Sequence, residues 1–298
     1  MASRPLPPRD LFAALTVAVI WGVNFVAVKA AVTAIPPFLV ITLRFAGVAL
    51  LLAPFTRPRP GQWRWLMALA VVLGVGHFGL LFLSLRFLDA TTAAVVVQLG
   101  VPFSVLLAWV FLGERPGRRR LVGLALAFGG VVVLAGGRSG HAGSGWGPVL
   151  IVVTATAMWA TANILVKRLG KVSPILLNGW VSLLAAPLVL GLSLLFEHGQ
   201  RMALETAGWQ AWAGVAFSTL ASSVVAYTLW YRLLARYPVS RVVPINLLAP
   251  VVGFAAGMIL LGETAGPAKI AGGVVTLIGV AIIELWPDRR EDEETTEA

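Results

Sequence analysis

Long apolar stretches recur along the whole chain, and short segments rich in Pro, Gly and Arg separate them. A helix of about 20 apolar residues matches the hydrocarbon core of a bilayer. Within lipid, every backbone polar group must be satisfied internally, which favours helices. The pattern therefore predicts an all-α polytopic membrane protein. Ten segments qualify as transmembrane helices: 11–31, 36–55, 64–86, 91–112, 119–136, 147–165, 174–196, 209–232, 241–261 and 268–286.

The two halves of the chain repeat one pattern. The stretch WGVNFVAVK at 21–29 is echoed by WATANILVK at 159–167, and LGE at 112–114 is echoed by LGE at 261–263. Each half holds five predicted spans, and because five is odd the second copy must cross the membrane in the opposite sense. Inverted repeats are typical of alternating-access transporters, which bind substrate near the bilayer midplane where the repeats meet.

Repeat boundaries follow from the same pattern. We expect a first five-helix repeat over 11–136 and a second, inverted repeat over 147–286, arranged around a central cavity. Residues 287–298 are polar, and we expect them to form a disordered cytoplasmic tail. Small residues that allow close helix packing recur on the fifth and tenth spans, at Gly123, Gly130, Gly272 and Gly279.

Composition supports a membrane protein and excludes other classes. Hydrophobic residues make up 58% of the chain and charged residues 12%, and the mean hydropathy is +0.88. The absence of cysteine excludes disulfides and thiol catalysis. The net charge of +10 could indicate nucleic acid, but the basic residues lie in short loops, so we expect no nucleic-acid partner.

The distribution of basic residues predicts the orientation of the chain. With the N-terminus in the cytoplasm, 17 Lys and Arg residues fall on the inner side and 5 on the outer side, while Arg44 lies within a span. Cytoplasmic loops of membrane proteins carry such an excess of positive charge. We therefore expect both termini to be cytoplasmic.

Several motifs carry a family resemblance: WGVNF at 21–25, LRF at 43–45, FLGER at 111–115 and PINLLAPVVGFAAGMILLGE at 244–263. With these motifs the chain resembles the EamA branch of the drug/metabolite transporter (DMT) superfamily over residues 11–286. The resemblance implies two inverted five-helix EamA repeats with peripheral fifth and tenth spans, in a multi-pass protein of the bacterial inner (cell) membrane. It also implies transport of a small molecule. Amino-acid exporters and carriers of nucleotide sugars or sugar phosphates all belong to the superfamily, so the substrate stays open.

Matching polar residues occupy the first and sixth spans. Trp21 and Asn24 share a face of the first span, and Trp159 and Asn163 share a face of the sixth. Polar side chains within a span are costly and mark candidate sites. An indole stacks on substrate and an amide binds a carboxylate or ammonium group, so these four residues are candidate substrate ligands. The alternative is that the amides hold the two repeats together.

Two further candidates lie in the third and eighth spans. His77 could bind a carboxylate or carry a proton, or it could be a buried neutral imidazole bonded to a carbonyl. Tyr227 lies on the polar stripe of the eighth span and is a candidate substrate ligand.

Proline interrupts the fourth and ninth spans. Gln98 precedes Pro102 and Asn246 precedes Pro250 at the same spacing of four residues. Proline bends a helix and frees a carbonyl, so we expect Pro102 and Pro250 to act as gating hinges or as purely structural kinks. Gln98 and Asn246 are further candidate substrate ligands.

Arg44 is a charge inside the second span. Such a charge costs on the order of 3 kcal/mol on insertion scales. We expect no carboxylate within a span to pair with it, so carbonyls, the cavity or a substrate carboxylate must do so. The resemblance marks this arginine as a feature of the family across diverse substrates, which favours a structural role over direct substrate contact.

These features favour a transporter that exports amino acids, with neutral or aromatic ones favoured, by facilitative alternating access. An anionic metabolite of the sugar-phosphate or nucleotide type is the alternative. An intramembrane enzyme is disfavoured, because catalytic and metal-ligand clusters are absent from the sequence. We expect a monomer in the lipid bilayer with no cofactor.

Overall fold

The computed structural model describes residues 6–113, 115–137, 146–170, 172–237 and 239–285. The helices of the first half are α1 (Pro8–Ala34), α2 (Pro37–Leu52), η1 (Ala53–Phe55), η2 (Pro60–Gln62), α3 (Trp63–Leu69), η3 (Ala70–Gly79), α4 (Leu80–Phe87), α5 (Ala90–Val96), η4 (Val97–Leu99), α6 (Gly100–Leu112) and α7 (Arg118–Gly136). Those of the second half are α8 (Trp146–Leu169), α9 (Pro174–Phe196), α10 (Gln200–Thr206), α11 (Trp209–Ala216), η5 (Phe217–Ala226), α12 (Tyr227–Arg236), α13 (Val239–Asn246), α14 (Leu248–Leu261) and α15 (Pro267–Leu285).

The prediction of ten spans is confirmed. Over the described residues the structure holds ten helices that are long and apolar enough to cross a membrane. The seventh runs over Pro174–Phe196 as expected, and the eighth runs further than expected, to Arg236. A short helix, α10, lies between these two spans, and the hydropathy pattern does not predict it. The expected tail at 287–298 lies outside the described residues.

Proline and glycine set several helix ends. Pro37 and Pro174 lie in the first turns of α2 and α9, where a missing N–H costs nothing. Gly113 and Gly262 follow α6 and α14 with φ of 74° and 66°, a left-handed conformation that suits glycine. The LGE repeat of the sequence therefore marks the same helix end in both halves.

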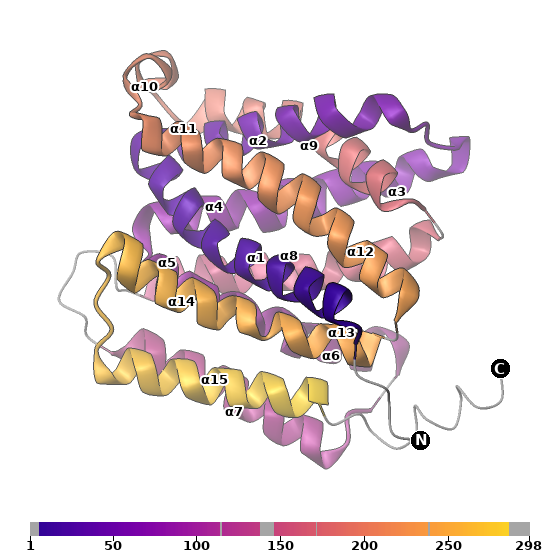
Figure 1. Cartoon of the computed structure of the whole chain (residues 1–298), viewed down its shortest axis with the longest axis vertical. Helices are drawn as coiled ribbons and strands as arrows, with labels where there is room; N and C mark the ends of the chain where they lie inside the picture. Colours follow the sequence, from indigo (N-terminus) through magenta and orange to yellow (C-terminus); the bar gives the residue numbers. More distant parts are fainter. Residues whose placement is uncertain (1–5, 114, 138–145, 171, 238, 286–298) are drawn as a thin grey trace.

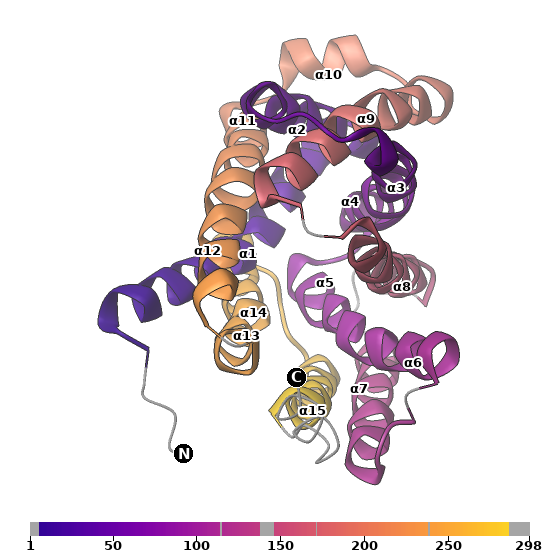
Figure 2. The ribbon, with the colours of Figure 1, turned by 90° about the vertical axis from the view of Figure 1, so that its right-hand side faces the viewer.

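The two halves pack through helix pairs that each take one member from either half. Figure 1 shows α1 beside α14, and α7 beside α15 at one edge of the molecule, and Figure 2 shows α7 and α15 at the same edge. A Cβ at Gly22 would lie 2.6 Å from the carbonyl oxygen of Ala249, so α1 and α14 touch through their backbones. The fifth and tenth spans are peripheral, as the resemblance implies.

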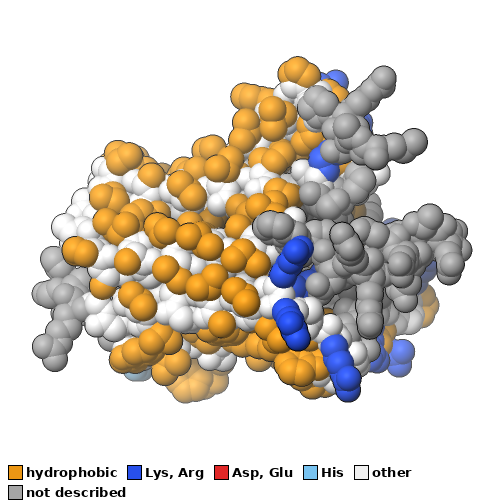
Figure 3. All heavy atoms as spheres, turned by 90° about the horizontal axis from the view of Figure 1, so that it is seen from below, with side chains coloured by type: hydrophobic (Ala, Val, Ile, Leu, Met, Phe, Trp, Pro, Cys, Tyr) orange, Lys and Arg blue, Asp and Glu red, His pale blue; other side chains and the backbone are white. Residues whose placement is uncertain are grey.

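The surface matches the expected membrane setting. Hydrophobic side chains cover most of the face drawn in Figure 3, whereas Lys and Arg side chains gather toward one end. Phe12, Leu50 and Ile259 are each more than 70% exposed. A contiguous apolar surface of this kind needs a lipid environment, and the chain is a multi-pass membrane protein.

Four spans depart from regular α-helix within their length. The third and eighth contain the π-helical segments η3 and η5. The fourth contains the 3₁₀ turn η4, which includes Gln98, and the ninth breaks at Leu247, directly after Asn246. Pro102 and Pro250 lack the backbone N–H that would bond the carbonyls of Gln98 and Asn246, four residues earlier in each helix. The irregularities place backbone and side-chain polar groups in the interior, which is where the candidate site lies.

Candidate functional site

Arg44 lies near the middle of α2 and is only 3% exposed. Its Nε–H donates to Ser223 Oγ at 2.8 Å, and its guanidinium carbon lies 4.5 Å from the ring centre of Phe78 and 5.4 Å from that of Phe82. Cation–π contacts of this kind stabilise a buried charge. Nη1, however, is buried with no hydrogen-bond partner among the described residues. An unpaired buried donor costs about 1–3 kcal/mol, and more when it is charged.

The π-helical segment η5 presents the groups that surround Arg44. Ser223 Oγ donates to the carbonyl of Ser218 at 2.8 Å, five residues earlier. The carbonyl of Ser223 accepts from Asn178 Nδ2 at 2.7 Å, and that of Ser222 accepts from Trp21 Nε1 at 3.4 Å. π-Helical turns in membrane or soluble helices frequently mark functional sites. Here the segment binds side chains from α1, α2 and α9.

Aromatic rings lie next to this polar cluster. The Trp21 ring lies 5.2 Å from that of Tyr227 and 5.3 Å from that of Trp230. Tyr227 also stacks on Tyr231 at 6.0 Å and lies close enough to Arg44 for an electrostatic interaction. Trp230 therefore packs on the Trp21 side chain.

His77 lies between Phe78, which contacts Arg44, and residues of α8 in the second half of the chain. Its Nδ1 lies 2.9 Å from the carbonyl oxygen of Ala155, a contact in which Nδ1 must carry the hydrogen. Its ring lies 4.7 Å from that of Phe78 and 6.5 Å from that of Trp159. The structure thus gives His77 the carbonyl contact that the structural interpretation requires. Trp159 in turn covers Gly100, where a Cβ would lie 2.7 Å from the indole ring.

These contacts unite five of the expected site residues. We name as the central cluster Trp21, Arg44, His77, Trp159 and Tyr227, which are linked through Ser222, Ser223 and Phe78. Both halves of the chain contribute to it. An arrangement of aromatic rings around one charged group can bind a small amphipathic molecule.

The other expected residues lie outside these contacts. Asn24 and Asn246 are half-buried, and the side-chain oxygen of each is buried with no partner among the described residues. Gln98 and Asn163 are also half-buried. Pro102 and Pro250 are buried beside the two helix breaks.

Sequence reasoning missed the contribution of Asn178 and did not single out Ser223 as a ligand. Asn178 is the one amide in the seventh span, and Ser223 belongs to a run of hydroxyl residues in an otherwise apolar span. Those were usable signals. The hydrogen bonds of Ser223 to Asn178 and to Arg44 depend on how α2, α9 and η5 pack. The sequence pattern does not predict that packing.

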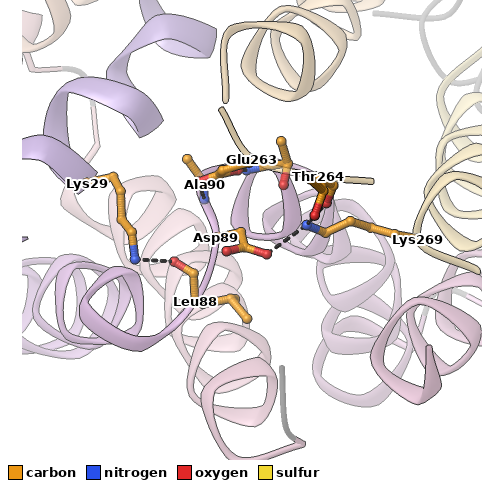
Figure 4. A network of polar contacts seen from close by, with 8 residues as sticks. Lys29, Leu88, Asp89, Ala90, Glu263, Thr264 and Lys269 are labelled. Carbon is orange, nitrogen blue, oxygen red and sulfur yellow. Dashed lines mark hydrogen bonds and ion pairs between the residues drawn. The ribbon is translucent and has the colours of Figure 1, made fainter. Parts of the chain in front are cut away.

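A second polar network joins helix ends of both halves. Figure 4 shows the Lys269 ammonium reaching Asp89, at 2.7 Å, and the Lys29 ammonium reaching the carbonyl of Leu88, at 3.0 Å. Lys269 also donates to the carbonyl of Thr264. Lys29, which also donates to the carbonyl of Leu85, therefore caps the carboxyl end of α4.

Glu263 belongs to this network and completes the start of α5. It accepts hydrogen bonds from the backbone N–H groups of Ala90 and Thr91 at 2.7 and 2.8 Å. Glu263 of the repeated LGE motif therefore caps a helix of the other half. Its counterpart Glu114 lies outside the described residues.

A family model decides what kind of protein this fold and this cluster belong to. The model of the EamA-like transporter family matches residues 9–136 and 146–285, nearly the whole chain and once in each half. The chain belongs to the EamA-like transporter family. It is therefore a membrane transporter and not an enzyme, and the resemblance seen in the sequence motifs is confirmed.

Relatives of this EamA-like transporter carry informative names. A "Probable amino-acid metabolite efflux pump" of Salmonella typhimurium is 32% identical, over 92% of this chain and 94% of the relative. A protein of the same name from Escherichia coli is 29% identical over the same shares. A "Probable terminal-alkyne amino-acid exporter" of Streptantibioticus cattleyicolor is 28% identical over 70% of this chain and 68% of its own.

A solved crystal structure shares the fold. It covers 96% of this EamA-like transporter and 100% of its own chain, with a TM-score of 0.59 and 20% identity. At that identity the likeness extends to the fold alone.

One expectation for this EamA-like transporter is wrong. We expected no carboxylate within a span, yet Glu284 lies in the last turn of α15 and Asp10 in the first turn of α1. Both are at helix ends. Asp10 accepts a hydrogen bond from the Tyr237 hydroxyl, and Glu284 Oε2 has no partner among the described residues. Neither carboxylate is an ion-pair partner of Arg44 over the described part of the chain.

Proposed function

We propose that this transporter exports amino acids across the bacterial inner membrane, neutral and aromatic ones above all, by facilitative alternating access. The central cluster is the observation that carries the proposal. It combines one buried cation, Arg44, with the rings of Trp21, Tyr227 and Trp159, and it takes residues from both inverted repeats. Relatives named for the efflux of amino-acid metabolites support the same substrate class.

The charge of the cluster favours a zwitterion over a sugar phosphate or nucleotide. Arg44 and Lys269 are the buried basic residues of the described chain, and Lys269 is bound to Asp89. One available cation can balance one carboxylate, whereas a phosphate ester carries nearly two negative charges at pH 7. An aromatic or aliphatic side chain would lie against the indole rings.

The remaining candidates take supporting roles in the proposal. Asn24, Asn163, Gln98 and Asn246 offer amides to the ammonium group, and two of these amides hold a buried oxygen without a partner. His77 holds the position of Trp159 through its contact with Ala155. We further propose that Pro102 and Pro250 act as hinges, because the spans are already broken beside them.

The positions of the carboxylates support a facilitative mechanism. Asp10 and Glu284 lie at helix ends, away from Arg44, and the Nδ1–H of His77 donates to the carbonyl of Ala155. The cluster thus offers no carboxylate as a proton carrier. We propose that net flux follows the amino-acid gradient, with the basic end of the molecule and both termini in the cytoplasm and with the monomer as the transporting unit.

The test is uptake of labelled amino acids into proteoliposomes that contain the purified protein, with and without an imposed pH gradient. We expect saturable uptake of neutral and aromatic amino acids that is independent of the pH gradient. Uptake of sugar phosphates but of no amino acid would overturn the proposal, and uptake that requires a pH gradient would overturn the facilitative mechanism.

A matched pair of tryptophan variants tests whether the central cluster is the site. Trp159→Ala should reduce uptake about tenfold, since a ring contact is worth about 1 kcal/mol or more. Trp209→Ala removes an indole that is 75% exposed and should leave uptake unchanged. Equal uptake by both variants would place substrate binding elsewhere.

A further inference from the structure

The hydrogen-bond inventory of Arg44 is incomplete. A guanidinium has five N–H donors. Among the described residues, only Nε–H has an acceptor, Ser223 Oγ at 2.8 Å. Nη1 is buried without a partner, in a residue that is 97% buried. The terminal fork of this arginine is therefore the unsatisfied part.

Among the residues that the structure describes, no anionic side chain pairs with Arg44. Phe78 and Phe82 offer ring faces, which attract the charge but do not replace a hydrogen-bond acceptor with lone pairs. The carboxylates of Asp10 and Glu284 belong to helix ends. A buried guanidinium with a free fork matches a carboxylate, which accepts two parallel N–H bonds from it.

Hydrogen bonds from the second repeat fix the orientation of the Arg44 guanidinium. Ser223 donates its own hydroxyl hydrogen to the carbonyl of Ser218, so its lone pairs face the Nε–H of Arg44. Asn178, on α9, donates from Nδ2 to the carbonyl of Ser223 at 2.7 Å. Because Ser223 already accepts from the Nε–H of Arg44, the terminal nitrogens Nη1 and Nη2 are available to a ligand. Ser223 and Asn178 are thus positioning residues for Arg44.

We propose that the terminal nitrogens of Arg44 bind the carboxylate of the transported molecule, so that Arg44, Ser223 and Asn178 form a carboxylate subsite. The inference builds on the proposed function, since it names the group of the amino acid that is recognised. The Trp21 indole bonds to Ser222, next to this subsite, and there it faces the organic part of the substrate. The transporter thereby selects amino acids over their carboxamides, in which an uncharged group replaces the carboxylate.

A purely structural role for Arg44 makes a different prediction, and acid and amide pairs separate the two. Purified protein in lipid nanodiscs is titrated with phenylalanine, leucine and alanine and with their carboxamides, and binding is followed by the change in tryptophan fluorescence. The wild-type protein should bind each acid about tenfold or more tightly than its amide, as expected for a charge-assisted pair. Arg44→Gln should abolish that ratio, chiefly by weakening acid binding.

Arg86→Gln is the matched control, because Arg86 donates to the carbonyls of Val32 and Thr33 at a helix end. It should keep the wild-type ratio. A ratio that stays at the wild-type value in Arg44→Gln would overturn the subsite. If Arg44→Gln does not fold, Ser223→Ala decides: the ratio should fall severalfold, and an unchanged ratio overturns the proposal.

The probe set also separates this subsite from the proposed function. Phenylpropionate is a carboxylate without an ammonium group. Arg44-dependent binding of phenylpropionate, in a protein that transports no amino acid, would keep the subsite and overturn the amino-acid function. Transport of amino acids with no Arg44 dependence would do the reverse. A wild-type protein that binds neither acids nor amides would overturn both.

Discussion

Gly130 on α7 faces the backbone of α15 at very short range. A Cβ added at Gly130 would lie 2.4 Å from the amide nitrogen of Thr276 and 2.6 Å from the carbonyl oxygen of Gly272. Because these are backbone atoms, rotation of a side chain cannot relieve the clash. An ordinary contact distance of about 3.5 Å requires the two helices to separate by about 1 Å. We therefore expect Gly130→Ala to destabilise the transporter.

The size of the effect follows from packing. Overpacking a close contact costs typically about 1–3 kcal/mol, and here Gly123 and Gly279 extend the same contact along both helices. With an entropy of unfolding of about 2.1 cal/mol/K per residue, about 2 kcal/mol corresponds to a fall of about 3 °C in Tm for a chain of this size. The assay is thermal unfolding in detergent, followed by tryptophan fluorescence and size-exclusion chromatography.

Gly129→Ala is the control, because a Cβ at this neighbouring residue meets nothing within 4 Å. Alanine favours a helix over glycine by about 1 kcal/mol, so this variant should keep or raise the Tm. Equal Tm values for the two variants would refute the packing argument. Altered substrate choice in Gly130→Ala at normal stability would contradict the assignment of this glycine to packing.

Three further predictions concern the polar contacts and the site. Lys269→Met should lower the free energy of unfolding by on the order of 2 kcal/mol, between the values for surface and buried ion pairs, because Asp89 loses its partner. A Tm equal to that of the wild type would show that the pair does not contribute to stability. Glu263→Ala should cost about 1 kcal/mol by uncapping α5, and unchanged thermal unfolding would argue against that cap. Asn24→Ala should abolish transport, and Trp159→Ala should lower it about tenfold, while both proteins still purify as monodisperse species. Aggregation of either variant would assign that residue to folding instead.

Much of the fold was predictable, because membrane insertion leaves a simple signal. Lipid imposes about 20 apolar residues per helix, and the ten spans follow from that length rule. The repeated LGE motif likewise marks corresponding helix ends, since Gly113 and Gly262 both adopt a positive φ. The short helix α10 was not predicted because a polar surface turn leaves no hydropathy signal.

The candidate site was predictable in its residue types and not in its contacts. Trp21 and Tyr227 were expected to face substrate, and their rings do meet. The bond between Arg44 and Ser223 depends on a π-helical segment, and the sequence rules for amphipathic periodicity assume 3.6 residues per turn. The cap that Glu263 forms on α5 could not be predicted, because it depends on tertiary packing and not on proximity in the sequence.

An experimental structure with a bound amino acid tests the central claim most directly. The account predicts that the carboxylate lies on the terminal nitrogens of Arg44 and that the side chain lies against Trp21, Tyr227 or Trp159. An amino acid bound at another place, with Arg44 held only by Ser223 and the phenylalanine rings, would contradict it.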